Sequence, residues 1–200
     1  MSTTTTRLPL ATADGVAAQV LELLRPHCER IDIAGSVRRR RPTIGDLEIV
    51  CIPKAYDASP GRSILFCSGI ATVVNQWEKV KGELPCRYTQ RVLPWHGMKL
   101  DLFMPHPDGY GLQLAIRTGS AEWSHRVLAA AWVRAGFTSK DGLLRRGSEQ
   151  QVSLFAIGAD RYHHSFREID GAICPTPTEE ALFGMIGIPW VDPTAREVRG

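Results

Sequence analysis

The sequence predicts an α+β protein made of two globular units, and three observations lead to this prediction. Apolar residues recur at helical spacing in some segments and alternate at strand spacing in others, and a proline- and glycine-rich stretch at 105–111 divides the chain. With 200 residues, 44% of them hydrophobic, the chain is long enough for one or two compact cores. We expect a flexible tail over 1–11, a first unit over 12–105 and a smaller α/β unit over 106–200.

The expected elements of the first unit follow one another as helix, strand, strand, helix, strand and strand. The first helix begins near residue 13 and ends near Pro26, because its apolar residues keep a three- to four-residue spacing up to that proline. Apolar residues on one stripe favour a second helix over 69–83. Strands are expected at 30–35, 46–53, 86–94 and 98–105, with a tight turn at 95–97.

The second unit is expected to open and close with helices. The first begins at the N-cap Ser120 and ends at Gly136. The last spans 176–187, with Thr178 as its cap and acidic residues in its first turn. Between them, strand-like pieces lie at 152–158 and 167–173.

Composition narrows the class of protein. The net charge of +3 and the pI of 8.7 permit a nucleic-acid partner without requiring one. Five cysteines without metal-ligand spacing indicate reduced thiols. Neither a signal peptide nor a membrane span is evident, so we expect a cytoplasmic monomer with no membrane partner.

Three acidic residues lie inside strands that are otherwise apolar. Asp46 and Glu48 are two residues apart, so on a strand they project from the same face, and Asp101 lies within the strand expected at 98–105. If those strands are neighbours, the carboxylates converge and need cations, and hard oxygen ligands suit magnesium. The alternative is that Asp46 and Glu48 lie on the solvated face of an edge strand.

The loop before these acids combines groups that bind phosphate. In GSVRRRRPTIG, glycine permits close backbone approach, serine offers a hydroxyl and arginine forks onto phosphate oxygens. We expect a triphosphate to lie against Ser36, Arg39 and Gly45. The alternative for the arginines is a solvated basic run or a localisation signal.

Four segments, in order, resemble the family X DNA polymerases of the nucleotidyltransferase superfamily. GSVRRRRPTIGDLEIV is similar to the family's Gly-Ser, Arg-Arg and Gly-Asp-x-Asp signature, with Glu48 in place of the last aspartate. MKLDLFMP resembles the strand of the third catalytic aspartate, IRTGSAEW the segment that touches the incoming nucleotide, and TEEALFGMIGIPWVDPTARE the carboxy-terminal helix. The resemblance runs from about residue 15 to the end of the sequence.

The resemblance implies a palm domain with a mixed sheet and flanking helices, followed by a nucleotide-selection domain, without the family's amino-terminal lyase domain. It implies metal-dependent addition of nucleotides to a primer 3′-hydroxyl on gapped or primed DNA, with nucleoside triphosphates as substrates and two Mg²⁺ ions, or Mn²⁺ in their place. Asp46, Glu48 and Asp101 would be catalytic and bind the metals. The nucleotide would contact Gly35, Ser36, Arg39, Gly45, Thr118, Gly119 and Ser120.

Two further expectations concern selectivity and DNA. Ile116 and Arg117 stand where the resemblance places the family's aromatic pair, which discriminates against the ribose 2′-hydroxyl, and Ile116 predicts relaxed discrimination between deoxyribo- and ribonucleotides. Arg87, Arg91 and Lys99 are candidates for the DNA backbone, although surface arginines on an edge strand are the commoner case. The segment at 161–167 mixes basic and aromatic residues, as a nucleic-acid contact or an ordinary strand would.

Two other functions stay open. One is a nucleotidyltransferase that works without a template, or on RNA or a small molecule. The other is a non-catalytic nucleic-acid-binding module whose acidic residues are structural.

Overall fold

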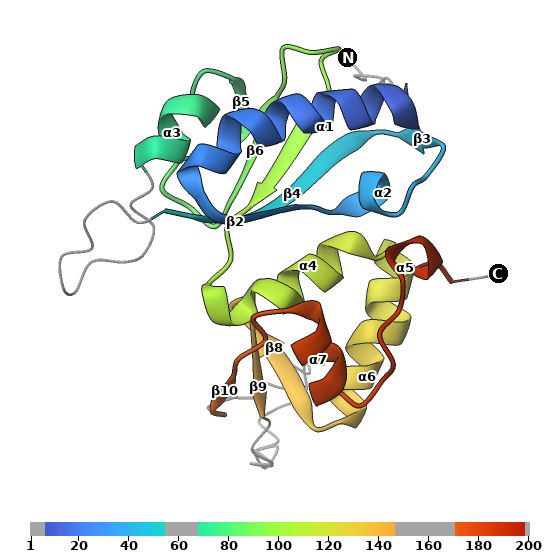
Figure 1. The fold of residues 1–200 in the computed structure, drawn as a ribbon. Helices are drawn as coiled ribbons and strands as arrows, with labels where there is room; N and C mark the ends of the chain where they lie inside the picture. The colour runs from blue at the N-terminus through green and yellow to red at the C-terminus, as the bar shows by residue number, and fades with distance from the viewer. Residues whose placement is uncertain (1–6, 55–67, 147–170, 199–200) are drawn as a thin grey trace, which may run out of the picture.

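The computed structural model describes residues 7–54, 68–146 and 171–198, and it is an α+β fold with a mixed sheet and flanking helices. Figure 1 shows two layers of structure, with the large sheet and its helices above and the carboxy-terminal elements below. Within the described ranges, no helix has the length and apolar character needed to span a lipid bilayer.

The first unit is centred on a five-stranded sheet. Its strand order is β2-β4-β7-β6-β5, and β4 runs parallel to β7 while the other pairs are antiparallel. The bounds are Cys28–Ile33 for β2, Asp46–Pro53 for β4, Glu78–Lys81 for β5, Tyr88–Val92 for β6 and Lys99–Phe103 for β7. The two strands that carry the acidic residues are therefore adjacent, and neither lies at the edge of the sheet.

Two helices cover one face of this sheet (Figure 1). They are α1 (Leu10–Leu24) and α3 (Ser68–Val74), and α1 begins within the segment expected as a tail. The buried residues of α1 pack on Leu47, Ile49 and Leu100, as the alternation in β4 predicts. A short pair, β1 (Leu8–Pro9) and β3 (Thr43–Ile44), and the one-turn helix α2 (Gly35–Arg38) complete the unit.

The helix expected over 69–83 is wrong beyond Val74. The chain turns there and returns as β5, which pairs with β6 along Glu78–Lys81. Trp77 is buried at 8% exposure beside Trp95, so it belongs to the turn rather than to a helical stripe. Pairing with an open sheet edge outweighs the local helical spacing of the apolar residues.

The second unit places helices around a small antiparallel sheet. The helices are α4 (Tyr110–Thr118), α5 (Ala121–Trp123), the π-helical turn η3 (Ser124–Ala129), α6 (Ala130–Arg134) and α7 (Glu179–Met185), with one-turn 3₁₀ segments η2 (Pro107–Gly109) and η4 (Pro193–Ala195). The sheet pairs β8 (Phe137–Lys140), β9 (Leu143–Arg146) and β10 (Ile173–Cys174). The first unit also contains a 3₁₀ turn, η1, which spans Arg25–His27.

The predicted helix caps of the second unit are confirmed. Ser120 Oγ accepts a hydrogen bond from the Trp123 amide, and Thr178 Oγ1 accepts one from the Ala181 amide. Helix α4 was not expected, and it occupies most of the stretch between the glycine-rich segment and Ser120. The strand expected at 152–158 and the segment at 161–167 lie outside the described residues.

The two units meet through a small apolar cluster on the other face of the large sheet. Val50 and Phe103 of the sheet pack there against Tyr110 and Leu114 of α4. The Tyr110 hydroxyl lies 2.7 Å from Asp32 Oδ2 and 3.0 Å from the Val50 carbonyl oxygen. Burial and the hydrogen bond to Asp32 raise the pKa of this phenol, so it stays a neutral donor.

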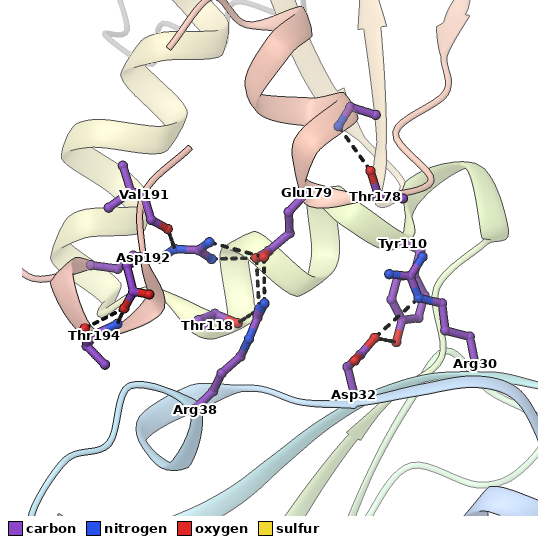
Figure 2. Close-up of polar contacts among 12 residues, drawn as sticks. Arg30, Asp32, Arg38, Tyr110, Thr118, Thr178, Glu179, Val191, Asp192 and Thr194 are labelled. Atoms are coloured by element: carbon purple, nitrogen blue, oxygen red, sulfur yellow. Dashed lines mark hydrogen bonds and ion pairs between the residues drawn. The ribbon is translucent and has the colours of Figure 1, made fainter. Parts of the chain in front are cut away.

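A buried ion-pair network also joins the units (Figure 2). The Glu179 carboxylate accepts hydrogen bonds from both Arg38 of α2, at 3.0 and 2.7 Å, and Arg196. Glu179 is 3% exposed and Arg196 is 0% exposed. Burial would raise the pKa of Glu179, but the hydrogen bonds from Arg196 and Arg38 outweigh burial and lower it. Helix α2 is therefore held in place by Glu179, a residue near the carboxy-terminal end of the described chain.

Candidate functional site

Glu48 and Asp101 lie side by side at the centre of the large sheet. They are register partners on the parallel strands β4 and β7, so their side chains leave the sheet on the same face. Asp46 lies two residues before Glu48 on that face and pairs with Lys99. Of the two sequence interpretations, the geometry therefore fits a convergent acidic group, and the edge-strand alternative is excluded by the position of β4 inside the sheet.

Gly35 makes room for the Glu48 carboxylate. Gly35 adopts φ +62°, in the left-handed region that favours glycine, and a Cβ atom there would lie 2.0 Å from Glu48 Oε2. The backbone at the start of α2 is thus pressed against the acidic group. The hydroxyl of the next residue, Ser36, is buried and has no hydrogen-bond partner among the described residues.

The acidic residues are held in a protonation-sensitive environment. Burial, followed by repulsion from Asp46 and Asp101, raises the pKa of Glu48 to about 7. Burial and then Asp101 also raise the pKa of Asp46, which Arg7, Lys99 and Arg39 partly oppose. Crowded carboxylates of this kind are stabilised when a cation joins them.

Asp101 is fixed in place by the neighbouring strand β6. The Tyr88 hydroxyl and Gln90 Nε2 both donate to Asp101 Oδ1, the latter at 2.8 Å. The Tyr88 and Phe103 rings are stacked with centroids 4.9 Å apart. Burial and the hydrogen bond to Asp101 raise the pKa of Tyr88, so this phenol remains a donor. Since both donors use Oδ1, Oδ2 is the carboxylate oxygen left for other partners.

A cleft of about 660 Å³ opens between the two units over Glu48 and Asp101. Its wall on the sheet side includes Tyr88 and Gln90, and its wall on the α4 side includes Arg117. Lys81, Arg87, Phe103, Pro105, Gln113, Asp141 and Gly142 complete the lining. Its volume lies in the range of small-molecule and cofactor sites.

The residues expected to hold phosphate and sugar have different surroundings from one another. Arg39 is engaged away from the cleft, because it donates to Glu197 at 2.9 Å and to the Thr118 carbonyl at 2.7 Å. Thr118 is buried and accepts from Arg38, while Ser120 caps α5. None of the residues expected to contact the nucleotide is among those that line the described cleft; these are Gly35, Ser36, Arg39, Gly45, Thr118, Gly119 and Ser120.

The basic residues expected at the DNA backbone are also separated. Arg91 is 2% exposed and lies on the opposite face of the sheet from Asp101, where it donates to Asn75 and the Gly82 carbonyl. Arg87 lines the cleft, and its guanidinium donates to the Asp141 carbonyl at 2.8 Å. Lys99 stays beside Asp46 as its register partner. We call the face of the large sheet that carries Asp46, Glu48 and Asp101 the acidic face. Arg87 and Lys99 therefore lie near the acidic face, whereas Arg91 does not.

The donor chemistry of the acidic group suits a divalent metal ion. Carboxylate oxygens on a rigid sheet are ligands that Mg²⁺ and Mn²⁺ accept, and a bound cation would relieve the crowding that raises the pKa of Glu48. Within the residues that the structure describes, no three His, Cys, Asp or Glu side chains form a ready metal-binding group. The two register partners Glu48 and Asp101 are the ligands that fit best, and Asp46 lies two residues before Glu48 on the same face.

Sequence reasoning missed three side chains at this site. Tyr88 and Gln90 follow the strand period of two, so a register for β6 against β7 would have placed both beside Asp101. Arg117 was associated with sugar selection, whereas its guanidinium lies in the cleft with Glu48 and Asp101. Ile116, on which that expectation depends, packs against the core of the second unit.

Comparison with known proteins adds no relative: no protein-family model matches the chain, and a search of curated proteins finds no significant match.

Proposed function

We propose that this protein is a metal-dependent nucleotidyltransferase that adds nucleotides to the 3′-hydroxyl of a DNA primer and fills short gaps in repair or replication. The observation that carries the proposal is the register pairing of Glu48 with Asp101 on adjacent parallel strands, with Asp46 two residues away on the same face. Its support from sequence is the ordered resemblance to family X DNA polymerases.

In the proposed reaction, the primer 3′-oxygen attacks the α-phosphorus of a nucleoside triphosphate. A bond forms between that oxygen and phosphorus, and the bond from the α-phosphorus to the bridging oxygen breaks, so pyrophosphate leaves with the electron pair. Asp101 would receive the hydroxyl proton on Oδ2, since Oδ1 already accepts from Tyr88 and Gln90. Solvent then takes the proton.

Asp46, Glu48 and Asp101 are the residues that would hold Mg²⁺ or Mn²⁺. When bound, the ions supply positive charge that offsets the carboxylates and the phosphate oxygens. Gly35 keeps the start of α2 against the Glu48 carboxylate, and Ser36 offers an unpaired hydroxyl there. The protein would thus orient the triphosphate beside the acidic group.

The test is primer extension on a gapped DNA duplex with Mg²⁺ and each labelled deoxynucleoside triphosphate in turn. Asp101→Asn keeps the shape of the side chain but removes its charge, so extension should be lost. Asp14→Asn changes a half-buried residue of α1 that does not line the cleft, and it should extend as well as wild type. Equal extension by wild type and Asp101→Asn would refute the assignment of Asp101.

The same assay separates the two other functions. Addition that ignores the template base would indicate a template-independent enzyme. DNA binding that survives chelation, without incorporation of any nucleotide, would indicate a binding module with a structural acidic group.

A further inference from the structure

Arg117 forms no salt bridge in the described part of the chain, although its charge acts on nearby Glu48. Its guanidinium lies 4.1 Å from the centre of the Phe103 ring, and its Nε atom is buried with no hydrogen-bond partner. The other arginines of the inter-unit region are engaged: Arg38 and Arg196 on Glu179, and Arg39 on Glu197. An arginine that is partly desolvated and unpaired is costly unless a ligand completes its hydrogen bonds.

The position of Arg117 explains which ligand group it could meet. It projects from α4 into the cleft opposite Glu48 and Asp101, and two more cations, Lys81 and Arg87, line the same cleft. Among the cations that act on Glu48, Arg117 has the largest effect in lowering its pKa. A ligand in the cleft would therefore meet the carboxylates of Glu48 and Asp101 as well as cations, of which Arg117 comes from α4 and Lys81 from the sheet.

We infer that Arg117 binds the phosphate oxygens of the nucleotide in this cleft, rather than selecting its sugar. This inference rests on the proposed function. The guanidinium is held over the Phe103 ring at the cleft, and a planar guanidinium can donate two parallel hydrogen bonds of the kind that phosphate accepts. Arg39, which the sequence suggested for this task, is already used by Glu197 and the Thr118 carbonyl.

An uncharged part of the nucleotide is a poorer partner for this group. A ribose hydroxyl or a base would leave the guanidinium charge uncompensated beside an aromatic ring, whereas a phosphate supplies both the charge and the paired acceptors. The inference thus predicts that affinity lost on changing Arg117 depends on the number of phosphates in the ligand.

The experiment measures equilibrium binding by calorimetry, with Ca²⁺ in place of Mg²⁺ to suppress turnover. The probes are deoxyadenosine triphosphate, deoxyadenosine monophosphate, deoxyadenosine and inorganic tripolyphosphate. For Arg117→Gln, we expect affinity for the two triphosphate probes to fall about tenfold or more, since hydrogen bonds to charged groups contribute this much. Affinity for deoxyadenosine should be unchanged.

Two further variants make the test specific. Arg117→Lys keeps the charge but loses the planar fork, so it should restore only part of the triphosphate affinity. Arg134→Gln removes an exposed arginine of α6 and should bind every probe as wild type does. A purely structural role for Arg117 would instead lower the melting temperature and weaken all probes together.

The outcomes separate this inference from the proposed function. If wild type binds triphosphate and Arg117→Gln binds it equally well, the inference is overturned and the proposed function stands. If wild type binds tripolyphosphate through Arg117 but shows no preference for nucleotides, the phosphate site stands and the proposed function fails. If wild type binds none of the probes, both fail.

Discussion

Changing Glu179 to glutamine should destabilise the protein more than any other single change to a charged residue discussed above. The carboxylate accepts hydrogen bonds from Arg38 and Arg196, and an amide offers one oxygen while turning its NH₂ group toward guanidinium donors. Arg196, at 0% exposure, would keep its charge without a carboxylate. Removing one partner of such a buried pair costs about 3–5 kcal/mol.

Two features of the structure bear on that magnitude. The Arg196 guanidinium lies 5.5 Å from the Trp123 ring centre and 5.3 Å from that of Phe183, and these cation–π contacts persist in the variant. They stabilise the cation by about 0.5–2 kcal/mol each, so we expect the loss to lie near 3 kcal/mol. This is a large share of the 5–15 kcal/mol typical of folded proteins.

Urea unfolding followed by tryptophan fluorescence measures this loss, and Trp123 reports from within the network. Glu180→Gln is the matched control, because Glu180 is exposed in the same first turn of α7. The pH dependence gives a second check. Since the folded pKa of Glu179 lies below 4.5, its stabilisation is present above pH 4.5 and is lost as the pH falls through the folded value.

A loss below about 1 kcal/mol, or one equal to that of Glu180→Gln, would refute the reasoning. It would mean that water reaches Arg196 and that the network behaves as a surface ion pair.

Three other predictions concern the acidic face, and a fourth concerns the sugar of the nucleotide. In EDTA, the free energy of unfolding should fall as pH rises from about 4.5 to about 7, because the folded state holds the Glu48 proton more tightly than the unfolded state does. Glu48→Gln should remove this pH dependence and raise the free energy of unfolding by up to roughly 3 kcal/mol at pH 8. Parallel curves for the two proteins would contradict this. Gly35→Ala should lower the free energy of unfolding by about 1–2 kcal/mol and reduce primer extension, because of the strain at φ +62° and the displacement of Glu48. Gly15→Ala is the control, since a Cβ atom there meets nothing within 4 Å and should not destabilise the protein. Tyr88→Phe keeps the ring stack but removes a hydrogen bond to Asp101, so urea unfolding should show a loss of about 1–2 kcal/mol, and an unchanged midpoint would count against that bond. Competition kinetics should show relaxed discrimination between deoxyribo- and ribonucleotides, since Ile116 supplies no aromatic ring, and a strong deoxy preference would argue against it.

The acidic strand was predictable because its signal is local. Strand β4 spans the eight residues that the alternation indicates, with Leu47 and Ile49 on one face and Asp46 and Glu48 on the other. The α+β class and the mixed sheet with flanking helices are confirmed. The division into units at 105 and the enzymatic function stay predictions.

The errors have a common physical origin, because a local sequence pattern does not show which distant residues a segment contacts in the folded protein. The stretch Glu78–Lys81 follows helical spacing, yet it completes a sheet edge as β5. Glu179 has the position of a solvated residue in the first turn of a helix, yet it is buried by arginines from distant segments. Arg39 was suited to phosphate by its neighbours in sequence but is bound by Glu197.

The residues that hold α2 in place are synthesised much later than α2 itself. Gly35 presses on Glu48 from this short helix, while the acids that hold its arginines are Glu179 and Glu197. A nascent chain that has not yet reached those positions lacks these partners for α2, so the acidic face stays incompletely shaped until they have been synthesised. A polypeptide that stops short of Glu179 would thus leave Arg38 without its carboxylate partner.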